Sequence, residues 1–261
     1  MSVRIAWERR GDGAPVVLVH GLGYARWGWE PVADALAERF ELILVDNRGI
    51  GESDAPPGPY TARAMAGDVA GVLDEAGIER AHVVGTSLGG MIAQELALER
   101  PERVDRLVLA CTTPGGPGAF PTPEPTVRLL AEAPSLEPAA ALRRFVENAL
   151  TPQTVAGRPE LVERILAHRH ATAQPAEAWA AQAAAAASFD ASARLSGLGA
   201  PTLVLHGTDD RVVDVRNADL LGSLLPDAHV ELVPGGGHLF FWEQPERFVA
   251  ATASFLGEDR G

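Results

Sequence analysis

Residues 80–100 constrain the fold more than any other stretch, because they combine an apolar run, a crowded turn and a helix-like run. The apolar run covers Ala81 to Val84, the turn reads Gly85-Thr86-Ser87-Leu88-Gly89, and the helical pattern ends before Pro101. A Gly-x-Ser-x-Gly turn between a strand and a helix predicts a nucleophile elbow, in which the serine hydroxyl stands above the edge of a sheet. Since the chain contains 27 glycines, the pattern alone proves little, and the flanking strand and helix carry the prediction.

The rest of the chain alternates strand-like and helix-like segments in the manner of a parallel α/β sheet. Continuous apolar runs such as residues 15–20 are typical of strands buried on both faces, whereas the alternating run at residues 3–9 indicates an antiparallel edge strand. The predicted strands are residues 3–9, 15–20, 41–46, 81–84, 104–112, 201–206 and 229–233. The predicted helices of this part are residues 29–39, 61–76, 215–224 and 245–256.

The alternation stops between residues 113 and 198, where helix-like segments rich in Ala, Leu and Arg are separated by prolines. We therefore divide the chain into residues 1–112, the first part of the core, residues 113–198, a helical insertion, and residues 199–261, the second part of the core. Because ligands bind at the carboxyl edge of such sheets, the insertion is expected to form a cap over that edge.

Bulk properties restrict the partners. A net charge of −13 argues against nucleic acid and anionic membranes as ligands, because phosphate groups would be repelled. The single cysteine, Cys111, excludes an intrachain disulfide and a thiolate metal cluster. No secretory signal and no membrane-spanning run is recognisable, so a cytoplasmic location is expected. The oligomeric state cannot be read from the sequence.

A serine nucleophile needs a base to remove its proton and an acid to orient that base. Chains with this elbow carry serine, acid and histidine in that order. Of the seven histidines, only His229 and His238 follow a candidate acid loop, and His229 lies at the wrong end of its strand. The predicted base is therefore His238. His206 ends the strand before the acid loop and is not assigned a catalytic role.

Two neighbouring carboxylates, Asp209 and Asp210, follow the strand that ends at His206, and their order alone does not choose between them. The chemistry also needs two backbone N–H donors aimed at the oxygen on which negative charge develops. Leu88, directly after the serine, and Leu22, in the loop after the first parallel strand, are predicted to supply them. This constellation requires no metal and no cofactor.

With these residues placed, the chain resembles enzymes of the α/β-hydrolase fold that carry a helical cap, from about Val3 to Leu256. The motifs behind this resemblance are His20-Gly21-Leu22-Gly23, residues 46–53, residues 85–90, residues 206–210 and Gly237-His238. The resemblance implies a mostly parallel eight-stranded sheet, favours Asp210 over Asp209 as the acid, and gives residues 46–53 a structural role beside the site. Ser87 argues against haloalkane dehalogenases and epoxide hydrolases, which carry aspartate at the elbow.

Aromatic residues flank the two loops of the expected site, which indicates an apolar pocket, although packing between sheet and cap would explain each of them equally well. The candidate pocket residues are Tyr24, Trp27, Trp29, Phe240 and Trp242. We expect a carboxylesterase that acts on small to medium apolar esters through an acyl-enzyme on Ser87. A 3-oxoadipate enol-lactonase, a cofactor-free perhydrolase or haloperoxidase, a carbon–carbon bond hydrolase and a ligand receptor on a hydrolase scaffold are the alternatives.

Overall fold

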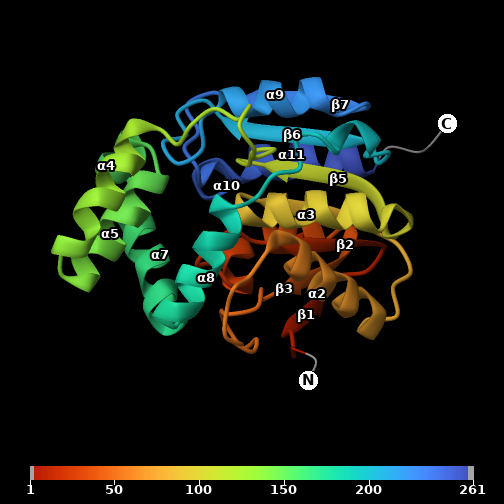
Figure 1. Cartoon of the computed structure of the whole chain (residues 1–261), viewed down its shortest axis with the longest axis horizontal. Coiled ribbons are helices and arrows are strands. Elements are labelled where there is room, and N and C mark those ends of the chain that lie inside the picture. Colours follow the sequence, from red (N-terminus) through yellow and green to blue (C-terminus); the bar gives the residue numbers. More distant parts are fainter. Residues whose placement is uncertain (1–2, 258–261) are drawn as a thin grey trace.

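The centre of the fold is a seven-stranded sheet in the computed structural model of the chain, which describes residues 3–257; its strands run across Figure 1 one above another, from β7 at the top to β1 at the bottom, with helices in front of and behind them. The strands are β1 (Trp7–Arg10), β2 (Ala14–Val19), β3 (Phe40–Val45), β4 (Ala81–Thr86), β5 (Val104–Ala110), β6 (Thr202–Gly207) and β7 (Ala228–Val233). Their order across the sheet is β1-β3-β2-β4-β5-β6-β7, with β1 antiparallel to β3 and all other neighbours parallel. The loops after the parallel strands therefore gather at one edge of the sheet.

The eight strands implied by the family resemblance are wrong for this chain, since residues 3–257 form seven. Residues before β1 do not add a strand because their backbone groups bind the loop after β3. The carbonyl oxygens of Arg4 and Ala6 accept hydrogen bonds from Asp54 and Asp46, at 2.9 Å each, and the Ala6 N–H donates to the Ser53 hydroxyl at 2.8 Å. The start of the chain thus braces this loop.

Two hydrophobic cores, one on each face of the sheet, explain why the parallel strands read as continuous apolar runs. Along β2, Val17 and Val19 pack into one core, and Val16 and Leu18 pack into the other. Outside the segment between β5 and β6, three helices contribute residues to the first core and three to the second (Figure 1). The first three are α2 (Ala62–Glu75), α3 (Leu88–Glu99) and α9 (Arg216–Leu224), and the others are α1 (Glu30–Ala37), α10 (Phe240–Glu243) and α11 (Pro245–Leu256).

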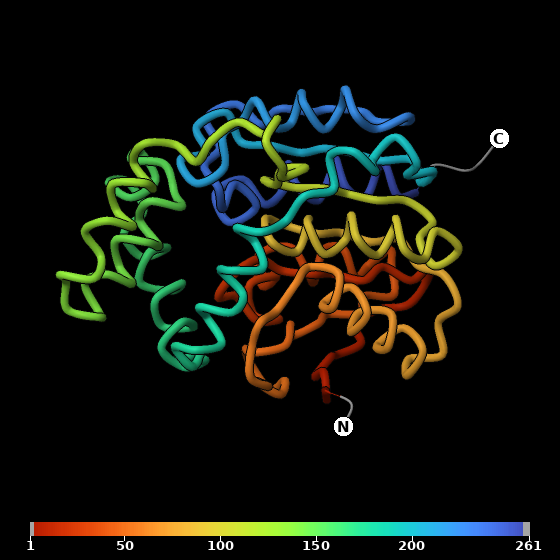
Figure 2. The backbone as a smooth tube through the Cα atoms, in the orientation of Figure 1, coloured from red at the N-terminus to blue at the C-terminus, as the bar shows by residue number. Residues whose placement is uncertain are grey.

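The segment between β5 and β6 is helical, as its composition predicted, and Figure 2 shows the chain leaving the sheet after β5 and returning before β6. Its helices are α4 (Glu124–Glu132), α5 (Pro138–Ala149), α6 (Pro152–Gly157), α7 (Pro159–Ala171) and α8 (Ala176–Ala187). The prolines that separated the helical patterns stand at the first positions of α5, α6 and α7, where a missing N–H costs nothing. We call residues 113–198 the insertion.

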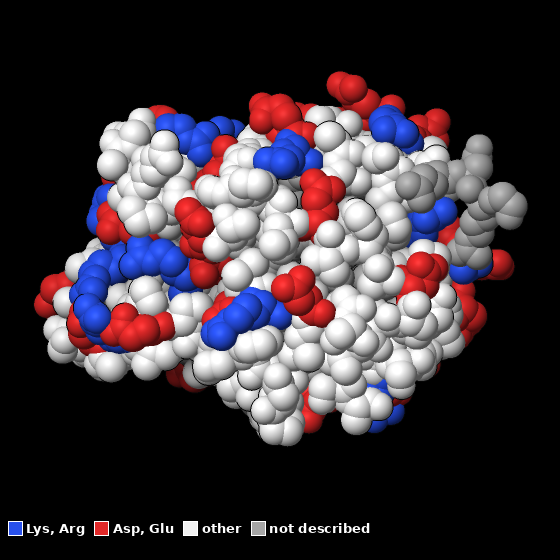
Figure 3. All heavy atoms as spheres, turned by 90° about the horizontal axis from the view of Figure 1, so that it is seen from above, with Lys and Arg blue, Asp and Glu red and all other residues white. Residues whose placement is uncertain are grey.

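Charged side chains of both signs are interspersed over the face drawn in Figure 3, with no single-sign patch over it. Within residues 3–257, every helix is too short or too polar to cross a membrane.

Candidate active site

Ser87 forms the sharp turn between β4 and α3. Its φ of 53° lies in the left-handed region that residues other than glycine rarely adopt. Close contacts require the flanking glycines: a Cβ atom on Gly89 would lie 2.0 Å from the Val19 carbonyl oxygen, and one on Gly85 would lie 2.3 Å from the Gly89 carbonyl oxygen. Such strain costs on the order of 1–3 kcal/mol and is found mainly at functional sites.

The loops after β6 and β7 bring Asp210 and His238 together. The distance between His238 Nδ1 and Asp210 Oδ2 is 2.8 Å, and both side chains are buried. Asp209, by contrast, is exposed, and its carboxylate accepts a hydrogen bond from the Thr208 hydroxyl. Of the two aspartates, Asp210 is the one that faces His238. Because a carboxylate only accepts, His238 Nδ1 carries the hydrogen, and Nε2 is the basic nitrogen.

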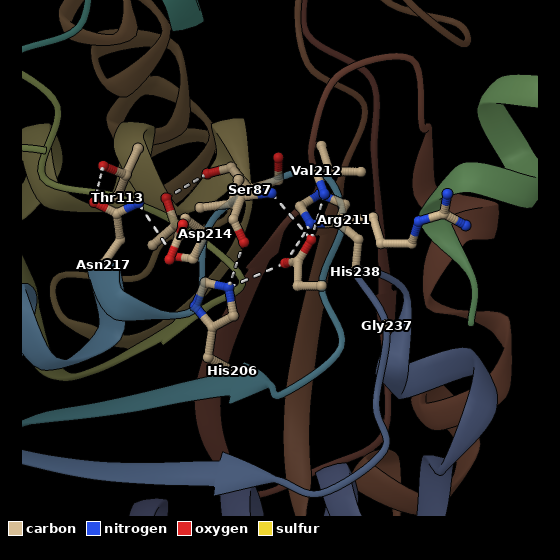
Figure 4. Close-up of polar contacts among 12 residues, drawn as sticks. Ser87, Thr113, His206, Arg211, Val212, Asp214, Asn217, Gly237 and His238 are labelled. Atoms are coloured by element: carbon tan, nitrogen blue, oxygen red, sulfur yellow. Dashed lines mark hydrogen bonds and ion pairs between the residues drawn. The ribbon is translucent and has the colours of Figure 1, made fainter. Parts of the chain in front are cut away.

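Both oxygens of Asp210 are held by donors. Oδ1 accepts hydrogen bonds from the backbone N–H groups of Val212, at 2.7 Å, and Val213, at 3.0 Å. Oδ2 also lies 3.0 Å from Nε2 of a second histidine, His206 (Figure 4). Burial alone would raise the pKa of Asp210, but the charge of His238 and the hydrogen bonds of both imidazoles outweigh it and hold that pKa well below its usual range. Asp210 is therefore an anion at neutral pH.

Ser87, at the end of β4, lies at the same carboxyl edge of the sheet as this pair, beside the end of β5. The Thr112 hydroxyl donates to the Ser87 carbonyl oxygen at 2.7 Å, and burial together with the charge of Asp210 raises the pKa of the neighbouring Cys111 thiol. Figure 4 shows Ser87 and His238 within one polar cluster. In the described structure, the Ser87 hydroxyl and His238 Nε2 are not hydrogen-bonded to each other. In enzymes without bound substrate, hydrogen bonds between a nucleophile and its base are often long, and they shorten when substrate binds.

Two backbone donors flank the serine. In the turn at residues 21–24, which we call the oxyanion turn, the Tyr24 N–H donates to the Gly21 carbonyl oxygen at 3.3 Å, and Gly23 has a φ of 78°. The Leu22 N–H shares a planar peptide with that carbonyl and points the opposite way, out of the turn. The Leu88 N–H opens α3 and has no acceptor inside the helix. Neither N–H finds an acceptor in the described part of the chain.

The insertion holds the oxyanion turn through two side chains. Arg169 in α7 donates to the Gly23 carbonyl oxygen, and Gln182 in α8 accepts from the Gly23 N–H at 3.4 Å. Burial lowers the pKa of the Arg169 guanidinium, which has no carboxylate partner among residues 3–257. The same turn also packs against the serine, because a Cβ atom on Gly21 would lie 2.9 Å from the Ser87 Cβ.

The predicted pocket aromatics separate into two groups, and one of them belongs to the hydrophobic core. Trp29 and Phe240 are fully buried, and their ring centroids lie 6.2 Å and 5.9 Å from that of Phe248 in α11. These contacts give both residues a packing role in the core, and a pocket role stays a prediction for them. The sequence could not separate the two roles, because core and pocket residues alternate within a few positions of the same loops.

The other three aromatics, Tyr24, Trp27 and Trp242, lie where the core meets the insertion. The guanidinium of Arg169 lies 5.3 Å from the centre of the Tyr24 ring. Trp27 stacks on His168 of α7, with centroids 4.9 Å apart, and Trp242 lies 6.2 Å from Trp27. These contacts join the core to the insertion, and a contribution to a substrate pocket stays a prediction for the three residues.

Sequence reasoning missed three residues of this site. The chain position of His206, before the acid loop, gives it no catalytic role, but its place four residues before Asp210, at the end of a strand, is a signal that it can reach the acid. Arg169 and Gln182 lie in helices of the insertion, and no local pattern indicates which of their side chains would reach the oxyanion turn.

Comparisons with known proteins show what this chain is similar to. The model of the alpha/beta hydrolase fold family matches residues 14–245. A putative carbamate hydrolase RutD of Azorhizobium caulinodans is 33% identical over 97% of this chain and 94% of its own length. A 2-hydroxy-6-oxo-6-phenylhexa-2,4-dienoate hydrolase of Burkholderia cepacia is 33% identical over 98% of this chain and 92% of its own. The crystal structure of the enol-lactonase from Burkholderia xenovorans has a TM-score of 0.87 and 26% identity, covering 98% of this chain and 97% of that one.

Proposed function

The chain belongs to the alpha/beta hydrolase fold family, and from this premise we propose that it is a serine hydrolase that cleaves carboxylic esters of small to medium apolar compounds. The observation that carries the proposal is the 2.8 Å contact between Asp210 and His238, at the sheet edge where Ser87 has its left-handed backbone. A serine hydroxyl becomes a strong nucleophile only beside an oriented base, and this arrangement supplies both the base and its orientation.

In the proposed mechanism, the Ser87 oxygen attacks the ester carbonyl carbon while His238 Nε2 takes the hydroxyl proton. Asp210 stabilises the resulting imidazolium through Nδ1. The N–H groups of Leu22 and Leu88 bind the negative oxygen of the tetrahedral intermediate, and each such donor typically lowers the barrier by about 3 kcal/mol. His238 then protonates the departing alcohol. Water, activated by the same imidazole, hydrolyses the acyl-enzyme and restores Ser87.

We further propose that the insertion acts as a cap over the carboxyl edge. Two contacts support this assignment: Arg169 and Gln182 both reach the oxyanion turn, which packs against Ser87. A cap in this place excludes water from the site and strengthens the interactions with the charge of the transition state. Tyr24, Trp27 and Trp242, at the junction of core and insertion, are the residues that would meet the apolar part of a substrate.

The test uses a fluorophosphonate probe and a chromogenic p-nitrophenyl ester with the intact protein and with Ser87→Ala. We expect the variant to lose labelling and to retain less than about a thousandth of the esterase activity. Ser223→Ala is the matched control, because Ser223 is an exposed serine in α9 that only donates to the Leu220 carbonyl oxygen. Labelling of Ser87→Ala at the rate of the control would refute the proposal.

A lactonase is the second candidate, favoured by the similarity to the enol-lactonase structure. A lactone is a cyclic ester, so the same residues would open it, and only the shape of the pocket would differ. Rates on matched linear esters and lactones separate the two readings. The substrate panel should also contain a carbamate and a 2-hydroxy-6-oxo-dienoate, the classes that appear in the names of the two relatives.

A further inference from the structure

Asp210 is contacted by two histidines on the same oxygen atom. His206 Nε2 lies 3.0 Å from Asp210 Oδ2, and His238 Nδ1 lies 2.8 Å from it, with His206 fully buried at the end of β6 (Figure 4). The mechanism above uses only one of these imidazoles. The other is a buried polar side chain beside the reacting groups, and its role needs a separate explanation.

The surroundings of His206 fix its tautomer. Nε2 also lies 3.1 Å from the carbonyl oxygen of Val213, and both of its neighbours are hydrogen-bond acceptors. Nε2 must therefore carry the hydrogen, which is shared between the Asp210 carboxylate and the Val213 carbonyl. Nδ1 is buried without a hydrogen-bond partner among residues 3–257. His206 thus presents its Nε2–H to the Asp210 carboxylate from a buried position at the end of β6.

We propose that His206 is a positioning residue for catalysis: its Nε2–H fixes Oδ2 of Asp210 in the orientation that His238 needs and shares the negative charge of that oxygen. The inference rests on the proposed function, because it presupposes that His238 acts as the base. The Val212 and Val213 N–H groups hold the other oxygen, so the carboxylate has little freedom to turn while His206 is present. Without His206, one side of Oδ2 loses its donor, and the whole charge of that oxygen acts on His238.

Three other titratable groups that face these side chains have pKa values shifted away from the range of about pH 5 to pH 8. His20, which faces His238, has a pKa lowered to about 3 by burial and by the charge of His238. Burial raises the pKa of Cys111 well above its usual value. The hydrogen bonds of Arg216 lower the pKa of Asp214, which faces His206. A change in the pH profile after a substitution at His206 therefore reports on the interaction between Asp210 and His238.

The experiment compares kcat and kcat/KM as functions of pH for the wild type, His206→Leu and His206→Gln with a p-nitrophenyl ester. Leucine removes the donor at similar bulk, whereas the glutamine amide nitrogen can take the place of Nε2. For His206→Leu we expect a fall in kcat of about tenfold and a rise of about half a pH unit or more in the acid limb of kcat/KM. His206→Gln should restore the wild-type acid limb and most of kcat. A His206→Leu enzyme with the wild-type acid limb would overturn the inference, even if it is less stable.

A second measurement on the wild type keeps the inference testable if His206→Leu does not fold. In protein with ¹⁵N-labelled histidine, His206 should show a protonated Nε2 and a bare Nδ1 at neutral pH, with the signals assigned by their loss in His206→Gln. A bare Nε2 would overturn the inference. Esterase activity of Ser87→Ala separates the failure of the proposed function from the failure of the role of His206. If Ser87→Ala stays active, the proposed function is wrong. If Ser87→Ala is inactive and His206→Leu keeps the wild-type pH profile, only the role of His206 is wrong.

Discussion

Replacing His20 by asparagine should remove a large part of the acid sensitivity of this fold. Burial, reinforced by the charge of His238, lowers the pKa of His20 from 6.5 to about 3. Its Nδ1 accepts a hydrogen bond from the Gly21 N–H at 2.7 Å, and its ring stacks on Tyr24 with centroids 4.7 Å apart. Protonation would destroy that hydrogen bond and place a charge in the core, so the folded protein keeps His20 neutral.

The direction in which stability changes with pH follows from the pKa of His20 in the unfolded chain, about 6.5, and in the folded chain, about 3. Below about pH 6.5 the unfolded chain binds a proton at His20 that the folded chain does not, so the free energy of unfolding decreases as the pH falls, by about 1.4 kcal/mol per pH unit. Between pH 7 and pH 5 the expected loss is about 2 kcal/mol from this residue alone. Asp210 does not contribute in this range, because its depressed pKa affects stability only below about pH 4.

Urea unfolding at pH 7 and pH 5 tests this value in the wild type, in His20→Asn and in His170→Asn. Asparagine can still accept from the Gly21 N–H but does not titrate in this range. We expect His20→Asn to be less stable at pH 7 and to lose about 2 kcal/mol less than the wild type on acidification. His170 is exposed and serves as the control that should keep the wild-type difference. Equal losses in the wild type and His20→Asn would refute the reasoning.

Three further predictions concern the site itself. Asp210→Asn should lower kcat by about 10⁴ because the amide selects the wrong tautomer of the base, whereas Asp209→Asn, in the exposed neighbour, should stay within about twofold of wild type in the same ester assay. Arg169→Met should lower kcat by about tenfold with a smaller effect on KM, because the Gly23 carbonyl loses its donor and the oxyanion turn becomes looser. Arg169→Lys should recover part of this loss. An unchanged kcat in Arg169→Met would show that Arg169 does not position the turn. Cys111 should react with Ellman's reagent only after unfolding in urea, since burial and the nearby charge of Asp210 disfavour its thiolate; rapid labelling of the native protein would contradict this.

The candidate residues Ser87 and His238 could be found in the sequence because each has a local signature at the end of a strand. Ser87 stands between two glycines, because the turn has no room for a Cβ atom at either position. His238 follows a run of glycines after the last strand. The parallel sheet then brings these ends together, so chain order and strand direction suffice to select them. No such local pattern separates Asp210 from Asp209. Adjacent side chains point in different directions, and only the geometry of the loop decides which carboxylate faces the histidine.

The contacts of the insertion could not be predicted for a physical reason. A helical pattern tells which side chains share a face, but the placement of that face over the sheet depends on packing between segments far apart in the chain. Gln182 is 159 residues away from the glycine that it contacts, and it lies in an Ala-rich helix with a weak amphipathic pattern. The sequence could not separate core from pocket aromatics for a related reason, since an aromatic ring beside a loop suits a core and a pocket equally well.

The loop of residues 234–238, after β7, also has a partner in the insertion. Glu243 in α10 is a buried carboxylate that accepts a hydrogen bond from the Gly237 N–H at 2.6 Å and another from the Thr151 N–H at 2.8 Å. One side chain therefore joins the residue before His238 to the start of α6. Since a lone buried carboxylate is costly, its retention depends on both donors being in place.

The acid loop is tied to the insertion in the same way, because the Thr126 hydroxyl of α4 donates to the Arg211 carbonyl oxygen at 2.5 Å. Together with the contacts of Arg169 on the oxyanion turn, each of the three loops around Ser87 has a partner in the insertion. A rigid-body movement of the insertion would break these hydrogen bonds at once and leave several buried polar groups unpaired, at about 1–3 kcal/mol each. Substrate entry is therefore expected to involve a local opening between insertion helices, while the contacts that position the catalytic loops stay formed.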